Sequence, residues 1–479
     1  MAQGNNNVGP APQWWHDPAN LLLLFGLLSG VALVFLLPPY QVADEWRHYF
    51  RVWQLAGGTL FGNGLGDDVP AELYRLTWET ENFWGLPTRE PLSWSAALDF
   101  LRRMAALRID EQEMLYVHFP TVLYAPVPYL SMTVAVALGR LVTDSPLLLM
   151  YAGRLGGLLL ALLLTWGAIR RAPFGKWAFF LMAMTPVVAF QRAGMSADGF
   201  INAAAMLHVA LVLELAYVPG RLVRTADLFR LGTITVALCL CKQAYLILPL
   251  LHVVIPANRF RSARDCRVAR YWLPAIGWAL AVWWAVSVMR GNYEPMAAGC
   301  DAMGQLGWIL GHPLQYLLVL FHDLVTHGNQ YLHELIGTLG WLDLPTAPWL
   351  VGTHAVALLV VIALDDDRQA ALSPFLRVWS ALVLIASLGF VWTLMYLWWA
   401  PVGAAELQGM QGRYFAPFLP LLPLVIAGSC RPDGRALLRQ AVFSGARPSV
   451  PWVMPRILGC YGAFLTIEML WRVTGHHYQ

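Results

Sequence analysis

Long apolar runs recur along the whole chain, and short polar segments separate them. A helix that spans a bilayer needs about 20 mostly apolar residues, and most of these runs reach or approach that length. The pattern therefore predicts an all-α polytopic membrane protein with a single transmembrane domain over residues 1–479. The clear runs are 19–39, 146–169, 176–191, 199–218, 272–289, 345–364, 375–399, 414–429 and 456–472.

Three further apolar segments, at 119–142, 228–256 and 306–327, are ambiguous by length and composition alone. The cations can place them, because cytoplasmic loops carry an excess of Lys and Arg. We therefore assign the short basic loops to the cytoplasm. Their cations are Arg170, Arg171 and Lys176; Arg221, Arg224 and Arg230; Arg259, Arg261, Arg264, Arg267 and Arg270; Arg368 and Arg377; and Arg431, Arg435, Arg439, Arg447 and Arg456.

Because both flanks of 228–256 are then cytoplasmic, this segment must enter the membrane and return. It is predicted to form a hairpin with legs 228–241 and 243–256 and with Lys242 at the tip. Each leg rises only about 21 Å at ~1.5 Å per residue, less than the roughly 30 Å of the hydrocarbon core. We expect the tip to end in a water-filled recess, because a lysine in lipid is costly.

The chain must cross the membrane an even number of times between two cytoplasmic loops. This requirement makes 119–142 and 306–327 interfacial segments on the outer side and predicts about 11 transmembrane helices. Two arginines directly after the first span lie outside, against the charge rule, but the later loops outnumber them. Two large outer loops follow from this topology, at 40–145 and 290–344. The second contains histidines that could bind zinc, but their spacing does not repeat one helix face and favours an amphipathic interfacial helix.

The composition supports the membrane class and excludes others. Of 479 residues, 58% are apolar and 13% are charged, against roughly 25% charged in ordinary soluble domains. A soluble domain could not hide that much apolar surface. The net charge of +3 is too small to indicate a polyanionic partner. The six cysteines have no metal-ligand spacing.

The first outer loop opens with two prolines that end the first span, and an acidic pair, Asp44 and Glu45, follows shortly after them. His48 and Arg51 follow Asp44 at helical spacing, so the three side chains share one helix face. Acid, imidazole and guanidinium together would suit an outward-facing site. A helix cap at Asp44 with salt bridges explains the same pattern, and the two readings stay open.

Four segments resemble a bacterial membrane-protein family of unknown function. They are PPYQVADEWRHYFRVWQLAGG (38–58), RAGMSADGF (192–200), CKQAYLILPLL (241–251) and QGRYFAPFLPLL (411–422). That family looks like the GT-C glycosyltransferase superfamily. The resemblance implies a GT-C-like fold with interfacial helices after the first span, an acidic residue in the first outer loop, and a polyprenyl-phosphate-linked sugar donor.

The resemblance also implies roles for the residues of the first outer loop. In an inverting sugar transfer, a carboxylate accepts the proton of the acceptor hydroxyl. Asp44 matches the position of that base, and Glu45 would be an alternate base or a metal ligand. Tyr40, His48 and Arg51 would support them.

The leaving group, a lipid phosphate, needs cations at the outer face. Lys242, Arg413 and Arg154, with Tyr414, are the predicted lipid-phosphate-binding residues. Snorkelling of Arg413 to headgroups and a structural ion pair of Lys242 remain alternatives.

Asp198 follows the RAGMS segment and is either a helix cap or a second acid facing the cavity. Asp44, Glu45 and Asp198 could hold a divalent metal such as Mg²⁺ or Mn²⁺ through hard oxygen ligands.

The resemblance, together with the acidic pair and the outward cations, implies a membrane glycosyltransferase that moves a sugar from a polyprenyl-phosphate-linked donor to a glycan, lipid or protein of the cell envelope. It would be a multi-pass protein of the bacterial cytoplasmic (inner) membrane, with the site facing the periplasm or exterior. A transporter or flippase of a lipid-linked sugar is one alternative. A protein that binds polyprenyl phosphate without catalysis is another.

Overall fold

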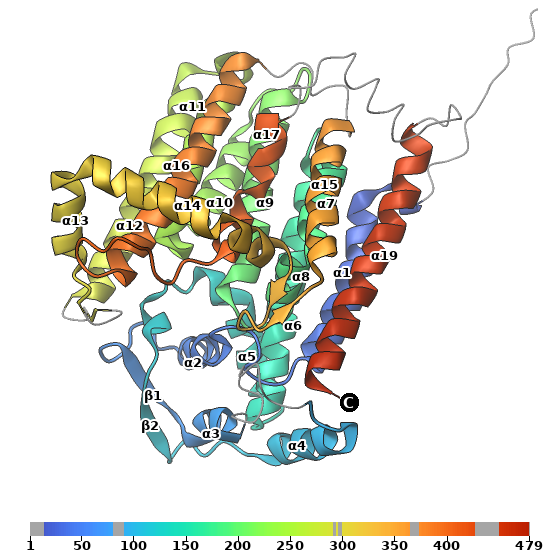
Figure 1. Cartoon of the computed structure of the whole chain (residues 1–479), viewed down its shortest axis with the longest axis vertical. Coiled ribbons are helices and arrows are strands. Elements are labelled where there is room, and N and C mark those ends of the chain that lie inside the picture. The colour runs from blue at the N-terminus through green and yellow to red at the C-terminus, as the bar shows by residue number, and fades with distance from the viewer. Residues whose placement is uncertain are drawn as a thin grey trace, which may run out of the picture.

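The computed structural model describes residues 14–79, 91–290, 294–295, 299–364, 373–426 and 450–478. A bundle of helices forms the upper part of the molecule in Figure 1, and a layer of short helices with a pair of antiparallel strands lies below it. The cationic residues Arg368, Arg431, Arg435, Arg439 and Arg447 of the predicted basic loops lie outside the described residues.

Five helices within the described ranges are long and apolar enough to cross a membrane. They are Pro18–Leu36 (α1), Pro146–Arg171 (α6), Ala197–Tyr217 (α9), Ala263–Met289 (α11, η8 and α12 together) and Pro374–Trp399 (α16). This apolar, helical architecture defines a multi-pass membrane protein. Most of the remaining predicted spans are shorter or interrupted, and the long helix over 450–477 is not among the five. The count of about 11 therefore stays a prediction.

The interruptions have identifiable causes. Residues 176–191 form two helices, Lys176–Met184 (α7) and Pro186–Ala193 (α8), which meet at Pro186. Residues 412–421 form a 3₁₀ helix, η10 (Gly412–Leu421), with Pro417 and Pro420 inside it, and the short α17 (Leu422–Ile426) follows. Proline lacks the N–H that an α-helix interior requires. The other bundle helices are α15 (Pro348–Leu364) and α19 (Val450–His477).

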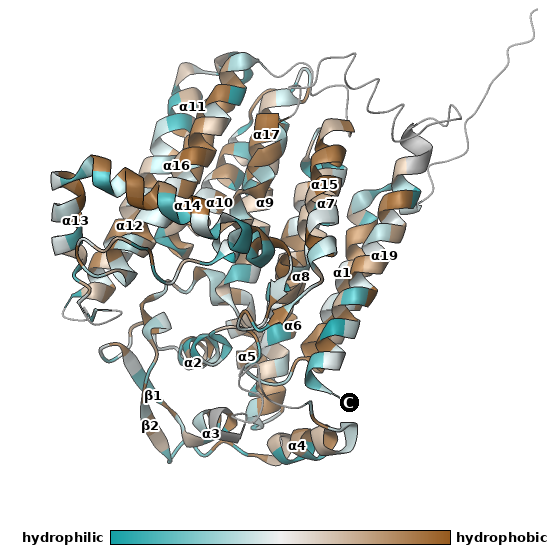
Figure 2. Ribbon diagram, in the orientation of Figure 1, coloured by the Kyte–Doolittle hydropathy of each residue, from teal (hydrophilic) through white to brown (hydrophobic). Residues whose placement is uncertain are grey.

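α9 is the central helix of the bundle, with 89% of its apolar window buried inside the protein. It packs on α6, α8 and α10 (Thr225–Cys241). By contrast, only 22% of the window in Ala263–Met289 and 28% of that in α16 are buried. Apolar residues predominate along α12 (Leu273–Met289), α15 and α16 in Figure 2. These helices therefore present the apolar surface that lipid would cover.

The predicted hairpin is present. α10 is its first leg, and the 3₁₀ turns Gln243–Tyr245 (η5) and Leu248–Val254 (η6) form the return. The two ends meet where the Val223 N–H donates to the Arg259 carbonyl at 2.8 Å. Lys242 is the residue at which α10 ends, so it stands at the tip as expected. The basic end continues through η7 (Ala257–Arg259), α11 (Ala263–Arg267) and η8 (Val268–Trp272).

The layer below the bundle comes from the loop after α1. Its helix α2 (Glu45–Ala56) is mostly hydrophilic in Figure 2. Strands β1 (Gly66–Pro70) and β2 (Met114–His118) pair antiparallel, with Gly66 opposite His118. The remaining elements are η1 (Trp14–His16) before α1, and α3 (Ala71–Glu79), α4 (Trp94–Ala106), η3 (Pro120–Leu123), η4 (Val127–Tyr129) and α5 (Leu130–Gly139) in this layer.

The two segments predicted as interfacial are not straight spans in the structure. Residues 119–142 begin with two 3₁₀ turns at prolines and continue as the ten-residue α5. In Figure 1, α14 (Pro313–Ile336) runs across the bundle instead of along it. One face of α14 exposes Leu314, Leu317 and Phe321, whereas Asp323, Tyr331 and Glu334 are buried. The short α13 (Ala302–Gly311) precedes α14, and the paired strands β3 (Thr338–Leu339) and β4 (Leu344–Pro345) follow it.

Candidate functional site

The acidic pair after α1 is split between two environments. Glu45 is fully buried and receives two bonds from Arg154, from Nε to Oε1 at 2.7 Å and from Nη2 to Oε2 at 2.6 Å. The backbone N–H groups of Tyr40 and Met195 also donate to Glu45, each at 2.9 Å. Both carboxylate oxygens are therefore occupied, and Glu45 ties the loop to α6 and to the turn before α9.

The Arg154 guanidinium has no N–H group left to bind a ligand. Besides Glu45, its guanidinium donates to the carbonyls of Val34, Leu37 and Pro38, at 2.7–3.1 Å. These carbonyls belong to the end of α1, where the helix leaves them without intrahelical partners. Its side chain is 0% exposed. Arg154 is thus part of a buried hydrogen-bond network at the end of α1, away from solvent.

Asp44 is in a different position from its neighbour. It stands at the start of α2 with φ 59°, a left-handed conformation, and its side chain makes no cap hydrogen bond. The carboxylate is 35% exposed and pairs with Arg47 at 3.0 Å. The structural explanation for Asp44 was a helix cap with salt bridges; the salt bridge is present, whereas the cap hydrogen bond is absent. A left-handed aspartate is uncommon, and such conformations gather at functional sites.

Asp198 and Lys242 form the ion pair at the centre of the site. Lys242 Nζ lies 2.6 Å from Asp198 Oδ1, and the two side chains are 19% and 15% exposed. Asp198 is in the first turn of α9, but Ser196 is the cap of that helix and accepts the Asp198 N–H at 3.2 Å. The Asp198 carboxylate is thereby free to face Lys242, and Gln191 donates to its other oxygen at 3.3 Å.

Arg413 approaches the same place from η10. Its electrostatic partners are Asp198, Asp44 and Tyr414, and its guanidinium carbon lies 5.7 Å from the centre of the Tyr414 ring. Arg413 makes no ion pair within 4.0 Å among the described residues, and its Nε is buried without a hydrogen-bond partner. The guanidinium therefore retains capacity to bind an anion.

His48 lies where these charges meet. Asp44, Asp198, Lys242 and Arg413 all act on its ring. Burial is the main cause that lowers the pKa of His48 to about 4, and Lys242 and Arg413 lower it further while the two carboxylates oppose them. The ring is therefore neutral at pH 7. Its Nδ1 lies 2.7 Å from the Tyr129 hydroxyl.

Arg51 and Tyr40 hold the loop together. Arg51 is fully buried and donates to Gln54, to the Leu60 carbonyl and to the Tyr124 carbonyl, so it links α2 to the segments around it. Tyr40 has φ 65° and is buried, and its carbonyl accepts the Trp341 Nε1–H at 3.1 Å. The segment 290–344 is thus fastened at Tyr40 to the loop that follows α1.

The metal alternative is not supported by the structure. Over the described ranges, no group of three or more His, Cys, Asp or Glu side chains could hold a metal ion. Glu45 is directed to Arg154, so Asp44, Glu45 and Asp198 do not converge as ligands. The same finding removes the zinc reading of the histidines in 290–344. Asp323 there accepts from Tyr331 and Trp392 instead.

Several aromatic and amide residues around the charges were not anticipated. Tyr124 lies over Lys242, with its ring centre 5.9 Å from Nζ, and Tyr245 also interacts with Lys242. Asn202 donates to Gln191 at 2.9 Å and so positions the amide that meets Asp198. Burial raises the pKa of Tyr124 above its usual value. Gln191 adjoins the RAGMSADGF segment and Tyr245 lies within CKQAYLILPLL, which is the only sequence signal for this group.

The comparisons with known proteins agree with this membrane architecture. The family model of the predicted membrane proteins DUF2142 matches residues 27–422, more than half of the chain, and the chain belongs to this family. The matched range includes all four segments that carried the resemblance described above. No curated protein and no solved structure matches the chain.

Proposed function

We propose that this protein is a membrane glycosyltransferase that transfers a sugar from a polyprenyl-phosphate-linked donor to an acceptor of the cell envelope. The observation that carries the proposal is the meeting of Asp44, an accessible carboxylate, with the cations Lys242 and Arg413 around one histidine. These residues come from segments far apart in the sequence. A base beside cations is what attack on a lipid-phosphate sugar requires.

The reaction proposed is a single inverting displacement. Asp44 accepts the proton of the acceptor hydroxyl as that oxygen forms a bond to the anomeric carbon. The bond from the anomeric carbon to the donor's phosphate oxygen breaks, and its electron pair goes to the phosphate. The products are the glycoside and polyprenyl phosphate, and Arg413 and Lys242 stabilise the negative charge that develops on the phosphate.

Orientation belongs to the same proposal. The basic ends of α6 and of the hairpin favour the cytoplasm, and we therefore propose that the Asp44 site faces the periplasmic or outer side of a bacterial inner membrane. Donor and acceptor would both reach the site from that side. The GT-C-like fold is part of this proposal.

The test is complementation of a deletion strain, with mass spectrometry of envelope glycans to identify the missing sugar. Purified protein in nanodiscs is then assayed with the corresponding polyprenyl-phosphate sugar. Asp44→Asn is expected to lower kcat at least ~100-fold, the usual contribution of a general base. Asp68→Asn, which changes an exposed carboxylate in the same layer, is the matched control and should keep full activity.

Three outcomes would contradict the proposal. Full transfer by the Asp44→Asn variant would remove Asp44 as the base. Donor movement across the bilayer with no glycosidic product would identify a transporter instead. Donor binding that depends on Lys242 and Arg413, with no transfer to any envelope acceptor, would identify a binding protein without catalysis.

A further inference from the structure

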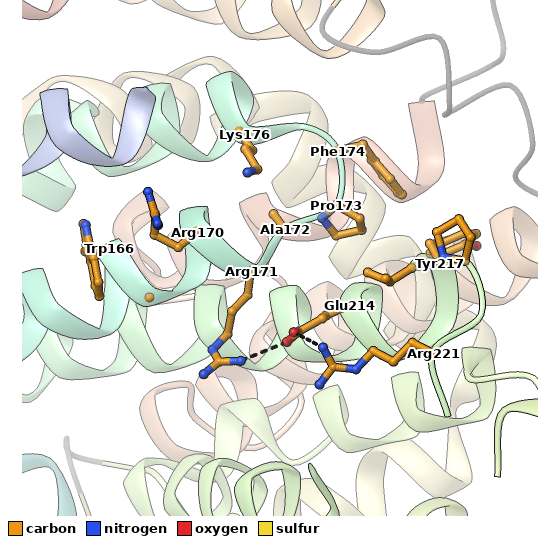
Figure 3. A pocket seen from close by; sticks show the side chains of 13 residues that line it. Trp166, Arg170, Arg171, Ala172, Pro173, Phe174, Lys176, Glu214, Tyr217 and Arg221 are labelled. Atoms are coloured by element: carbon orange, nitrogen blue, oxygen red, sulfur yellow. Dashed lines mark hydrogen bonds and ion pairs between the residues drawn. The ribbon is translucent and has the colours of Figure 1, made fainter. Parts of the chain in front are cut away.

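A basic pocket lies at the end of the bundle away from the Asp44 site. It has a volume of about 740 Å³ and opens between the C-terminal ends of α6 and α9 and the start of α7, as Figure 3 shows. The helix α9 connects this pocket to the Asp44 site, because it carries Asp198 in its first turn and Glu214 in its last. Sixteen residues separate them, about 24 Å at ~1.5 Å per residue.

The charges of the pocket do not balance. Its walls carry one carboxylate and several cations, which are Arg170, Arg171, Lys176 and Arg221 opposite Glu214. Arg171 and Arg221 both point to Glu214 in Figure 3, and Arg221 also pairs with Asp227 at 2.8 Å. These pairs neutralise the carboxylates and leave a net positive charge on the other side of the pocket.

Arg170 and Lys176 are the cations that remain to meet a ligand. Lys176 makes no ion pair with any residue that the structure describes. Arg170 pairs with Asp17 at 2.8 Å, but the two side chains are 53% and 31% exposed, and pairs this exposed contribute little. Both cations can therefore turn to an anion in the pocket at small cost.

The rest of the pocket wall is apolar or amphipathic. Trp166, Pro173, Phe174 and Tyr217 line it. Trp166 Nε1 and Tyr217 Oη are buried without a hydrogen-bond partner in the described part of the chain. Trp and Tyr at the ends of apolar helices lie at the level of lipid headgroups. A ligand suited to this wall has an anionic group next to an apolar body.

We propose that this pocket binds the phosphate of an anionic phospholipid headgroup. Arg170 and Lys176 bind the phosphate, while the half-buried Trp166 and Pro173 contact the apolar part of the lipid. Basic pockets between transmembrane helices are a recognised way of binding such headgroups. The apolar wall favours a lipid over a free phosphate compound, which would leave these side chains in water. The site is separate from the proposed sugar-transfer site.

The test is native mass spectrometry of the full-length protein with dioleoyl phosphatidylglycerol and, for comparison, dioleoyl phosphatidylcholine. The double variant Arg170→Gln/Lys176→Gln is expected to weaken phosphatidylglycerol binding about tenfold, or ~1.4 kcal/mol, and to leave phosphatidylcholine binding unchanged. The matched control is Arg261→Gln/Arg264→Gln, which removes the same charge from exposed positions outside the pocket. It should change binding less than twofold.

If the double variant does not fold, Lys176→Gln alone is expected to weaken phosphatidylglycerol binding as well. This variant should fold, since Lys176 makes no ion pair among the described residues. Equal loss in both double variants would mean general charge attraction and would overturn the proposal. So would equal affinity for the two lipids. Inorganic phosphate, titrated by calorimetry, is expected to bind at least 100-fold more weakly than phosphatidylglycerol. Phosphate binding as tight as that of the lipid would assign the pocket to a soluble phosphate compound and overturn the lipid assignment.

Discussion

Lys242 Nζ lies 2.6 Å from the carboxylate of Asp198, and this pair joins the tip of the α10 hairpin to the first turn of α9. The hairpin ends inside the protein, where an unpaired ammonium would be costly. Asp198 removes that cost. The structural alternative proposed for Lys242 from sequence is therefore present, and the same pair lies beside Arg413 and His48.

Breaking this pair should destabilise the protein. Removal of one partner leaves the other charge poorly solvated, which costs about 3 kcal/mol at the low end for buried pairs. Asp198→Asn and Lys242→Met should each lower the apparent melting temperature in detergent. The double variant should lose less than the sum of the two losses, because neither charge is then stranded. Additive losses would contradict a direct interaction.

The two members of the acidic pair should respond differently to the same chemical change. Glu45→Gln leaves the fully buried Arg154 without its counter-ion, and we expect a loss of about 3–5 kcal/mol and poor yield of folded protein. Asp44→Asn removes only a half-exposed bridge to Arg47 and should change stability by about 0–1 kcal/mol. Thermal unfolding of both variants is the measurement. A stable Glu45→Gln variant would show that the Arg154 network does not hold the loop.

His48 should make stability depend on pH. Burial lowers the pKa of His48 from its usual value of 6.5 to about 4 in the folded protein, so the unfolded chain binds more protons between these values. The contribution of neutral His48 to the free energy of unfolding is then fully present above pH 6.5. It is lost as the pH falls towards 4, and this loss is up to about 3 kcal/mol. Melting temperatures between pH 7 and 4.5 are expected to fall more steeply for the natural chain than for His48→Gln. The other buried histidines are shared by both proteins, so equal slopes would exclude His48 as the cause.

Gly412 fixes where Arg413 enters the site. A Cβ at this position would lie 2.0 Å from the Tyr331 carbonyl oxygen, and the Gly412 N–H donates to Glu334 at 2.7 Å. Gly412→Ala should therefore push η10 away from α14 and lower the free energy of unfolding by about 1–3 kcal/mol through overpacking. It should also displace Arg413, and sugar transfer should then be lost. Gly389→Ala, where nothing lies within 4 Å of the new methyl group, is the control. Unchanged stability and transfer in Gly412→Ala would contradict this account.

The sequence predicted the class of protein and part of the topology because these depend on local patterns. Apolar runs indicate membrane helices, and the basic flanks of 228–256 predicted the hairpin that the structure contains. Lys242 and Arg413 were selected as the cations that a lipid phosphate needs, and Asp198 was selected from its place in the RAGMSADGF segment. Their proximity to one another depends on tertiary packing, which no local pattern encodes.

Glu45 illustrates what the sequence could not separate. It adjoins Asp44 in the chain, but successive residues at a helix start point in different directions, and its partner Arg154 is more than one hundred residues away. Span counting had a similar limit. Pro186, Pro417 and Pro420 interrupt apolar runs, and hydropathy alone does not register such breaks.

The burial of α9 has a consequence for how the protein sits in a bilayer. The helix carries the Asp198 pair near one end and Glu214 near the other, and its surroundings are protein. The distance between the two charged layers is therefore fixed by the polypeptide and does not adapt to the lipid. At about 24 Å, it is shorter than the roughly 30 Å hydrocarbon core. Either the membrane becomes thinner around the protein or water reaches the charged residues at one end of α9. The length of the lipid chains should therefore affect activity.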